Sequence, residues 1–541
     1  MQIAKTFPKG AFPPSQGGNA PDISAQLRQQ REEHQRIQVR RAVELWWPRV
    51  LLIVLGGITA GIVGQFVFYY PIYIFAPMVA LVILFLMAWR VYFGMFMIAI
   101  ASTALFPQAF SVKALSVYPA IPLLLWLFFV LAVQVAFRIK EAILPSFWAI
   151  WPLLGMACLA IISNIVVQVT WTKGVPHKVG NSPIILDEFY GIALFLFPLI
   201  IIVVTTVSLV KKERWIEYIQ TAFLATSVLL AAIVIFEFKR IGATLYTFRF
   251  SDPKLLWMSL KAISQILVLG SMIGYVRMLY SKRWRMRFMY AGATLLCLGG
   301  VYLSLQNSWW VEAVVGFAVI TIVYSRKLFG AMCLLCLPLI PVVLAEIQKL
   351  ATVKTADFYR LIIWKDALRV WSKQPLLGVG PGNFWAYDQR FTQLPKYLRD
   401  FSKTGLGVSH NGYLQTFGEL GPLGLLLYIS MIVVIVVVAF RLYQRSKAGG
   451  KRSDAMLALV GLGLVCGSAL GDVTSGAMFL QPRQVGSSGS LTQVISTWII
   501  IGCILYKDQL WRMARKKLRF DKQETSSVNN TVDYALKGMA N

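Results

Sequence analysis

Apolar residues along this chain gather in long runs that are separated by short polar connections. Fourteen of these runs come near the roughly 20 residues that a helix needs to cross the hydrocarbon core of a bilayer. They predict helices at 50–68, 72–89, 93–106, 119–136, 146–167, 190–210, 216–236, 258–279, 288–304, 309–324, 328–345, 423–440, 455–470 and 491–506. The pattern therefore predicts an all-α, polytopic membrane protein of about 14 transmembrane helices.

The polar segments between these runs divide the chain into five predicted parts. Residues 1–45 read as a cytoplasmic tail, first disordered and then a charged surface helix, without a removable signal peptide. A bundle of about 11 helices follows at 46–345. A large loop is expected at 346–422, the last three helices at 423–506 and a basic cytoplasmic tail at 507–541. A loop of this length inside a compact bundle is more often functional than idle.

Composition agrees with the membrane class, and the charge distribution predicts an orientation. The chain is 57% apolar and only 14% charged, and its net charge is +29. A soluble protein with this charge would suggest nucleic acid, but here the basic residues lie between the apolar runs. They cluster in alternate connections: Arg138 with Lys140, 211–214, 281–287, Arg326 with Lys327, 441–452 and 507–519.

By the positive-inside rule these connections and both termini are cytoplasmic. We expect them to meet anionic membrane lipid and expect no nucleic acid partner. The opposite connections carry fewer basic residues, and with fourteen spans the 346–422 loop belongs to that outer side.

Within the loop, residues 357–373 predict an amphipathic helix with Arg360 in the middle of its apolar face. At 100° per residue, one set of side chains falls within about 100° of Arg360 on either side. This set is Leu361, Ile363, Trp364, Ala367, Leu368, Val370 and Trp371, and the opposite face holds Lys365, Asp366, Arg369, Ser372 and Lys373. If the apolar face packs, an unpaired guanidinium on it costs several kcal/mol, so Arg360 should meet acceptors. Two readings stay open: a fork for phosphate oxygens, or a snorkelling arginine paired with Asp357 or a carbonyl.

Two further segments follow along the loop. "PLLGVGPGNF" at 375–384 predicts a tight turn, with a nest of backbone N–H groups near phosphate as the alternative. "GVSHNGYLQTFGELGPLG" at 407–424 predicts a helix that Ser409 could cap and that Gly421 and Pro422 end. His410 can accept a proton near neutral pH, although a lone interfacial histidine is usually structural. Glu419 lies about 13 Å further along such a helix, too far to orient His410 directly.

Taken together, "YRLIIWKDAL", "PLLGVGPGNF" and "SHNGYLQTFGELGPLG" resemble the O-antigen ligase and O-antigen polymerase superfamily of bacterial membrane glycosyltransferases. The three motifs occur in the family's order between residues 359 and 424. The resemblance implies a GT-C-like fold in the bacterial cytoplasmic membrane. It also implies glycan transfer from an undecaprenyl diphosphate donor to a hydroxyl acceptor, with His410 and Arg360 as functional residues.

The sequence departs from a second signature of the family, T-x-S-R-G, at the outer start of a late span. The matching place is "YLSLQNSWWVEA", with Gln306 and Asn307 where an arginine is expected. Arg249, in the outer stretch "YTFRFSDPKLLW", is a candidate for the missing cation.

The residues predict a mechanism without metal or cofactor, because no outer connection holds a D-x-D pair or a cluster of metal ligands. We expect His410 to act as general base and Arg360, with Arg249, to bind the diphosphate, so that the anomeric configuration inverts. Asn411 is expected to orient His410 or the acceptor, and Glu419 to hold the loop.

The acceptor stays open between glycan, lipid A core and protein hydroxyls. A lipid-linked oligosaccharide flippase or polysaccharide exporter is the alternative function. It explains the spans and basic connections equally well, but it does not require the long outer loop.

Overall fold

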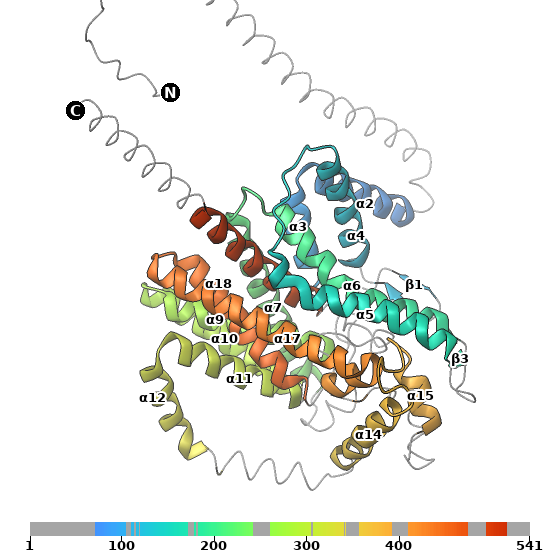
Figure 1. Cartoon of the computed structure of the whole chain (residues 1–541). Helices are drawn as coiled ribbons and strands as arrows, with labels where there is room; N and C mark the ends of the chain where they lie inside the picture. The colour runs from blue at the N-terminus through green and yellow to red at the C-terminus, as the bar shows by residue number, and fades with distance from the viewer. Residues whose placement is uncertain are drawn as a thin grey trace, which may run out of the picture. The chain divides into compact units, whose positions relative to one another are not determined.

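The protein is described by a computed structural model, shown in Figure 1. The chain divides into two compact units, Met1–Ile83 and Leu84–Asn541, and the helices from α3 onward belong to the second. The structure describes residues 71–103, 110–112, 115–117, 120–170, 178–179, 182–241, 260–304, 307–339, 341, 356–391, 409, 411–473 and 494–516.

Helices dominate the part of the chain that is described. They are α2 (Pro71–Trp89), α3 (Val91–Ala101), α4 (Ala120–Ala136), α5 (Phe147–Val169), α6 (Ile184–Ser208), α7 (Arg214–Ile241), α9 (Leu260–Tyr280), α10 (Trp284–Leu303), α11 (Asn307–Tyr324), α12 (Arg326–Cys336), η1 (Leu337–Leu339), α14 (Ala356–Trp371), α15 (Phe384–Phe391), α17 (Gly412–Ala448), α18 (Arg452–Gly471) and a helix at 494–516. Every predicted span overlaps one of them, except 50–68, which lies outside the described residues.

Strands are confined, among the described residues, to two short antiparallel hairpins. In the first, β1 (Phe110–Val112) pairs with β2 (Leu115–Val117), and Phe110 lies opposite Val117. In the second, β3 (Lys178–Val179) pairs with β4 (Ser182–Pro183). Neither hairpin contributes a layer to the fold.

The predicted class, an all-α polytopic membrane protein, is confirmed. By length and composition, six helices of the described chain can cross a membrane: α5, α7, α9, α10, α17 and α18. Shorter apolar helices accompany them, among them α3, α4 and residues 308–324 of α11. The total of 14 spans stays a prediction.

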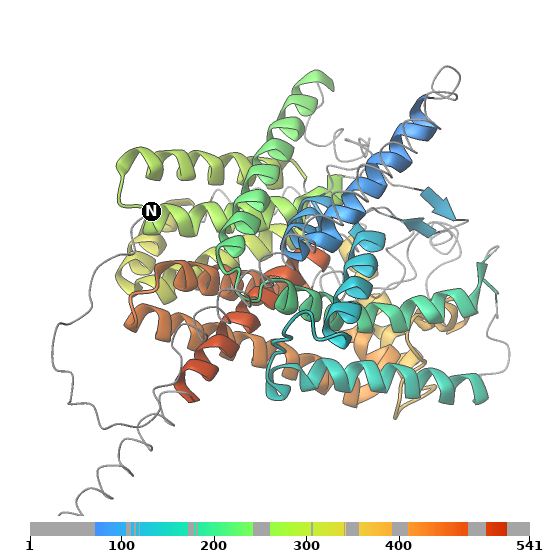
Figure 2. The ribbon, with the colours of Figure 1, turned by 90° about the horizontal axis from the view of Figure 1, so that it is seen from above.

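The bundle is built around α9, which packs against α7, α10, α11 and α18. Small residues bring its helices close together: a Cβ on Gly463 of α18 would lie 3.0 Å from the carbonyl oxygen of Gly316 in α11. Close backbone approach of this kind is the usual source of helix association inside a membrane. In Figures 1 and 2, α17 runs alongside α18 and completes this part of the bundle.

The basic connections meet at one end of the bundle. Lys507 forms ion pairs with Asp454, at 2.8 Å, and with Glu213, which joins the starts of α18 and α7 to the last described helix. The Nζ of Lys140 donates to the carbonyl of Ser208 at 3.3 Å, which adds the connection between α4 and α5. Charge alone predicted that these connections lie on one side of the membrane. The contacts of Lys507 and Lys140 bring them together at one end of the bundle.

The segment from α14 to the start of α17 lies at the opposite end. The hydroxyl of Ser163, near the far end of α5, donates to the carbonyl of Leu377 at 2.7 Å. Directly after the end of α5, the carbonyl of Thr170 accepts a hydrogen bond from the Nε2 of Gln374 at 3.1 Å. We call residues 356–391 together with 409 and 411–421 the loop subdomain.

The loop subdomain has a small core of its own. Its buried members come from α14, α15 and the connection between them, with Phe391 and Leu414 packed against them: Ala367, Val370, Val379, Phe384, Ala386 and Tyr387. This core corrects the predicted apolar face of α14. Leu361 and Leu368 are exposed, whereas Asp366, which was expected on the polar face, is buried together with Ile363.

The reason for this correction is that α14 packs against both α15 and α17, which together cover a different side of the helix from the one chosen by counting apolar residues. The buried face centres between Ile363 and Val370. The helix position of Arg360 therefore lies roughly 70° from that centre, at the edge of the packed face and not in its middle.

Two glycines fix the junction between the loop subdomain and the membrane part of α17. Gly421 has φ +70°, where α17 breaks, and Pro422 follows it, as the sequence predicted. A Cβ on Gly421 would lie 2.4 Å from the carbonyl oxygen of Leu376. Gly378, with φ +68°, would place a Cβ 2.3 Å from the backbone carbon of Glu419. Neither position therefore has room for a side chain.

We expect Gly421→Ala to destabilise the loop subdomain by several kcal/mol, because it combines a left-handed backbone with a backbone clash. Gly450→Ala is the matched control, since Gly450 also has a positive φ, +66°, but has no atom within 4 Å of its Cβ position. The control should cost only about 1 kcal/mol. Thermal unfolding of the two purified variants measures the difference, and equal losses would show that packing at Gly421 is not tight.

A buried carboxyl pair lies beside the core of the loop subdomain. Asp366 is fully buried and accepts a hydrogen bond from Nη1 of Arg369 at 2.7 Å. Asp388, on α15, is 5% exposed, and its Oδ1 has no hydrogen-bond partner among the described residues. Burial raises the pKa of Asp388 to about 8, and the neighbouring charge of Asp366 adds to the shift.

This pKa predicts a loop subdomain that weakens as the pH rises. The pKa of Asp388 is higher in the folded state than in the unfolded state, so the folded state binds the proton more tightly. The stabilisation from this proton is complete below about pH 4 and is lost as the pH rises to about 8. Between these limits the opening equilibrium should rise by up to about tenfold per pH unit. Amide hydrogen exchange of α15, corrected for intrinsic rates, measures this slope. In Asp388→Asn the slope should vanish while amides of α18 keep wild-type behaviour, and an unchanged slope would contradict the assignment.

Candidate functional site

The start of α17 directly follows His410 and is held by a side-chain cap. Asn411 has an extended backbone, and its Oδ1 accepts a hydrogen bond from the N–H of Leu414 at 3.0 Å. Ser409, which the sequence suggested as the cap, is instead buried and donates its hydroxyl to the carbonyl of Asn411 at 2.6 Å. The cap prediction was therefore wrong by two residues, because the helix begins at Gly412 and the capping position directly precedes it.

A second chain of hydrogen bonds reaches the same place from within the helix. The N–H of Ser409 donates to Oε1 of Gln415 at 3.0 Å, and the Nε2 of Gln415 donates to Oε1 of Glu419 at 2.6 Å. Both side chains are at most 3% exposed. Gln415 was missed by the sequence analysis, although its spacing of four residues from Glu419 is a usable signal. Glu419 thus reaches the residue before His410 through one intermediate side chain.

The end of α18 forms the third support of this helix start. The carbonyl of Asp472 accepts a hydrogen bond from the N–H of Gly412 at 2.9 Å, and its carboxylate accepts one from the hydroxyl of Tyr428. The hydroxyl of Tyr413 donates to the carbonyl of Ala469 at 2.7 Å. A Cβ on Gly412 would lie 2.9 Å from Asp472 Oδ2, so a side chain there would have to displace this carboxylate. No local sequence pattern connects Asp472 with this site, because the contact is made between two helices.

A further buried carboxylate, that of Glu312 in α11, lies near Asp472. Glu312 is fully buried, and its Oε1 accepts a hydrogen bond from the hydroxyl of Ser468 at 2.8 Å. It lies close enough to Asp472 for their charges to interact. Glu312 belongs to the segment in which the sequence departs from the family's second signature. Of the two residues singled out there, Gln306 is outside the described residues, and Asn307 is the first residue of α11.

The glycine turn of the loop subdomain is bonded to protein and forms no open phosphate nest. The N–H groups of Val379 and Gly380 donate to the carbonyls of Gly418 and Glu419, at 2.9 and 3.0 Å. The N–H of Gly382 donates to the carboxylate of Glu419. The tight-turn reading of this motif is confirmed. The nest reading is wrong for these three groups, because α17 already satisfies them.

The predicted site residues are described to different extents. His410 and Arg249 lie outside the described residues. Arg360 is described as a position on α14, without its side chain, while Asn411 and Glu419 are described in full. The ring of Trp371, at the end of α14, packs 4.7 Å from the ring of Phe417 in α17. The fold thus joins the helix that carries Arg360 to the helix that begins after His410 (Figure 1).

The chemistry of this region is that of buried carboxyl, amide and hydroxyl groups in fixed positions. Within the described ranges, no three side chains of His, Cys, Asp or Glu gather as a metal-binding group. Metal independence stays a prediction. What the geometry does provide is a helix start that is anchored from three directions next to the one residue predicted to move a proton.

Comparison with known proteins agrees with the motifs. No curated protein matches the chain. Residues 255–429 match the family model described as O-antigen ligase, and this segment includes both Arg360 and His410. The match agrees with the resemblance drawn from the three motifs and supports a glycan-transferring role of the ligase or polymerase type. Residues 255–429 are therefore similar to the O-antigen ligase family, and this segment contains membrane-spanning helices.

Proposed function

We propose that this protein transfers a glycan from an undecaprenyl diphosphate carrier to a hydroxyl acceptor on the outer face of the bacterial cytoplasmic membrane. The observation that carries the proposal is the anchored start of α17. Ser409 and Asn411, the two neighbours of His410, are buried and bonded to the helix and to each other. A general base must be held in position to be effective, and fixed neighbours restrict where its side chain can reach.

In the proposed reaction, the neutral imidazole of His410 removes the proton from the acceptor hydroxyl. The acceptor oxygen attacks the anomeric carbon of the donor sugar, and the bond from that carbon to the diphosphate oxygen breaks. The lipid diphosphate leaves as an anion with the electron pair of that bond. Attack from the face opposite the leaving group inverts the anomeric configuration.

Arg360, together with Arg249, is proposed to stabilise the departing diphosphate. The position of Arg360 at the edge of the packed face of α14 supports this role, because a guanidinium there can reach a ligand without being buried among apolar side chains. A planar guanidinium binds two phosphate oxygens at once, which suits a leaving group whose charge grows during the reaction.

Asn411 and Glu419 are proposed as positioning residues. Asn411 caps the helix that begins after His410, and Glu419 fixes Ser409 through Gln415. Glu419 also receives the N–H of Gly382, so it ties the glycine turn to the same helix. These contacts favour a supporting role over direct binding of the substrate.

The arrangement of the ends supports an outer site. The loop subdomain lies at the end of the bundle opposite the basic connections, and basic connections remain in the cytoplasm by the positive-inside rule. An outward-facing enzyme has no access to cytoplasmic nucleotide sugars. A donor that has already crossed the membrane on a lipid carrier meets this constraint, and both termini are then cytoplasmic.

The acceptor separates a ligase from a polymerase or a protein transferase, and a flippase or exporter is the alternative from another class. Incubating the purified protein with a lipid-diphosphate glycan and one class of acceptor at a time, without metal or ATP, distinguishes them. The proposed enzyme forms a new glycosidic bond with one of these acceptors. A transporter forms none, and that result would overturn the proposal.

His410→Ala should reduce the rate of glycan transfer by about 10²- to 10⁴-fold, because the acceptor oxygen then attacks without a base. Tyr413→Phe is the control, since it removes only the hydrogen bond that this helix start makes to Ala469. The control should keep its rate within several-fold. Near-normal transfer by a folded His410→Ala variant would remove the imidazole from the mechanism.

Arg360→Lys should weaken donor binding and transfer by about tenfold or more, because an ammonium keeps the charge but loses the two parallel hydrogen bonds. Lys365→Arg changes the cation of an exposed position on the same helix and should leave both quantities unchanged. Donor titration and initial rates measure the two effects. Wild-type donor affinity in Arg360→Lys would argue for a structural arginine.

A further inference from the structure

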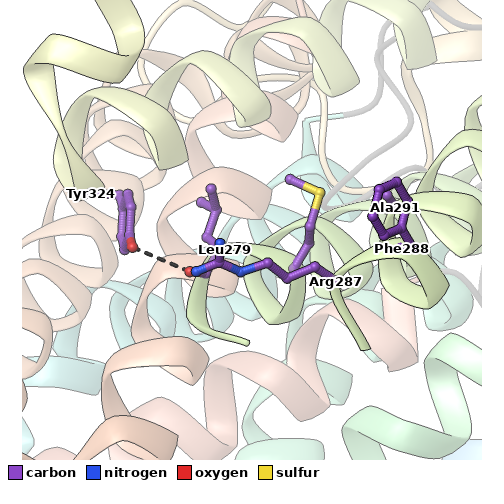
Figure 3. A pocket seen from close by; sticks show the side chains of 6 residues that line it. Leu279, Arg287, Phe288, Ala291 and Tyr324 are labelled. Atoms are coloured by element: carbon purple, nitrogen blue, oxygen red, sulfur yellow. Dashed lines mark hydrogen bonds between the residues drawn. The ribbon is translucent and has the colours of Figure 1, made fainter. Parts of the chain in front are cut away.

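A groove opens on the bundle far from the loop subdomain, between the ends of three helices. Its volume is about 390 Å³, within the range of small-ligand pockets, roughly 300–1,000 Å³. The lining residues come from α9, α10 and α11 and are mostly apolar: Met278, Leu279, Arg287, Phe288, Ala291 and Tyr324 (Figure 3). The groove exists because α10 and α11 both pack on α9 but have few contacts with each other.

One cation is fixed at this groove. The Nε of Arg287 donates to the carbonyl of Ser281 at 2.6 Å, which holds the guanidinium against the end of α9. Among the described residues, its two Nη groups have no hydrogen-bond acceptor. Across the groove, the hydroxyl of Tyr324 donates to the carbonyl of Leu279 at 3.2 Å (Figure 3). The groove therefore presents an oriented, solvent-accessible guanidinium beside apolar side chains.

The surroundings of the groove are strongly basic. Lys282, Arg283 and Arg285 are exposed on the adjoining turn, and Arg326 and Lys327 are exposed just after Tyr324. Along the sequence, no aspartate or glutamate occurs between Asp252 and Glu312, or between Glu312 and Glu346. Glu312 itself lies at the opposite end of α11 and is bonded to Ser468. The three helices thus supply no carboxylate near the groove to neutralise these cations.

The groove also faces the side of the bundle where lipid is expected. Only 28% of the membrane-spanning window of α10 is buried inside the protein, against 78% for α9. Trp284 and Phe288 are 66% and 71% exposed, and their rings meet edge to face at 5.8 Å. Exposed aromatic rings beside cations are typical of the membrane–water interface, where headgroup and acyl chain meet.

We propose that this groove binds an anionic diacyl phospholipid of the surrounding bilayer. Its phosphate accepts hydrogen bonds from the Nη groups of Arg287 within the field of the neighbouring cations, and part of an acyl chain lies over Leu279, Phe288 and Ala291. Basic pockets between membrane helices at the cytoplasmic interface bind anionic headgroups by this combination. The site is independent of the proposed glycan transfer, because it lies at the end of the bundle away from the loop subdomain.

Native mass spectrometry of the full chain, titrated with phosphatidylglycerol or phosphatidylcholine, tests the proposal. We expect wild-type protein to retain phosphatidylglycerol at least about tenfold more tightly than phosphatidylcholine, as one charge-assisted contact implies. Arg287→Gln should abolish that preference. Arg285→Gln removes an equal charge two residues away, from an arginine that lies over the ring of Trp284, and should change binding by less than threefold.

A second variant tests the shape of the groove without changing any charge. Ala291→Phe should fill the apolar part of the groove and weaken phosphatidylglycerol binding by about tenfold. This variant tests the proposal even if Arg287→Gln fails to fold. Equal loss in Arg287→Gln and Arg285→Gln would overturn the proposal in favour of diffuse charge attraction. Displacement of the bound lipid by a polyprenyl diphosphate at equal concentration would also overturn it, by assigning the groove to the carrier lipid.

Discussion

The backbone seam between the glycine turn and α17 is the contact on which the arrangement of this protein's site depends. Val379 and Gly380 donate their N–H groups to the carbonyls of Gly418 and Glu419, just before the helix breaks at Gly421. A broken helix leaves carbonyl groups without their usual partners, and inside a membrane protein such groups must be satisfied by other protein atoms. The turn supplies those partners. In doing so it attaches the loop subdomain to the bundle at the place where a span begins.

This seam explains why the motifs of the loop act as one unit although they are separated along the chain. Glycine at 378 and at 421 allows two backbones to approach where any side chain would collide. Glu419 accepts two hydrogen bonds that link this seam to the helix start: its carbonyl accepts one from the N–H of Gly380, and its carboxylate accepts one from the side-chain amide of Gln415. The hydrogen bonds that close the turn therefore also fix the residue before His410. Stability of the fold and placement of the proposed base rest on the same few groups.

Polar side chains also connect neighbouring helices at both ends of the bundle. At the end with the loop subdomain, Asp472 connects the end of α18 to the start of α17. At the other end, Lys507 connects two helix starts through two carboxylates. Between the ends, small residues such as Gly463 let the helices approach closely, and single hydrogen bonds such as that from Ser227 to the carbonyl of Ile266 add to the apolar packing. Charged side chains cost less at the ends of the helices than in the middle of the bilayer, which explains why these ion pairs lie there.

The sequence by itself determined the membrane class, the helices that the structure describes, the break at Gly421 and the resemblance to the O-antigen ligase superfamily, because each depends on local composition or on motifs of adjacent residues. Tertiary structure alone decided the packed face of α14, where Asp366 is buried and Leu361 is exposed. It also decided the cap at Asn411, the bonding of the glycine turn and the contact with Asp472. These features depend on which distant segment supplies the neighbouring atoms. Helical periodicity shows which residues share a face, but only the packed neighbours determine which face is covered.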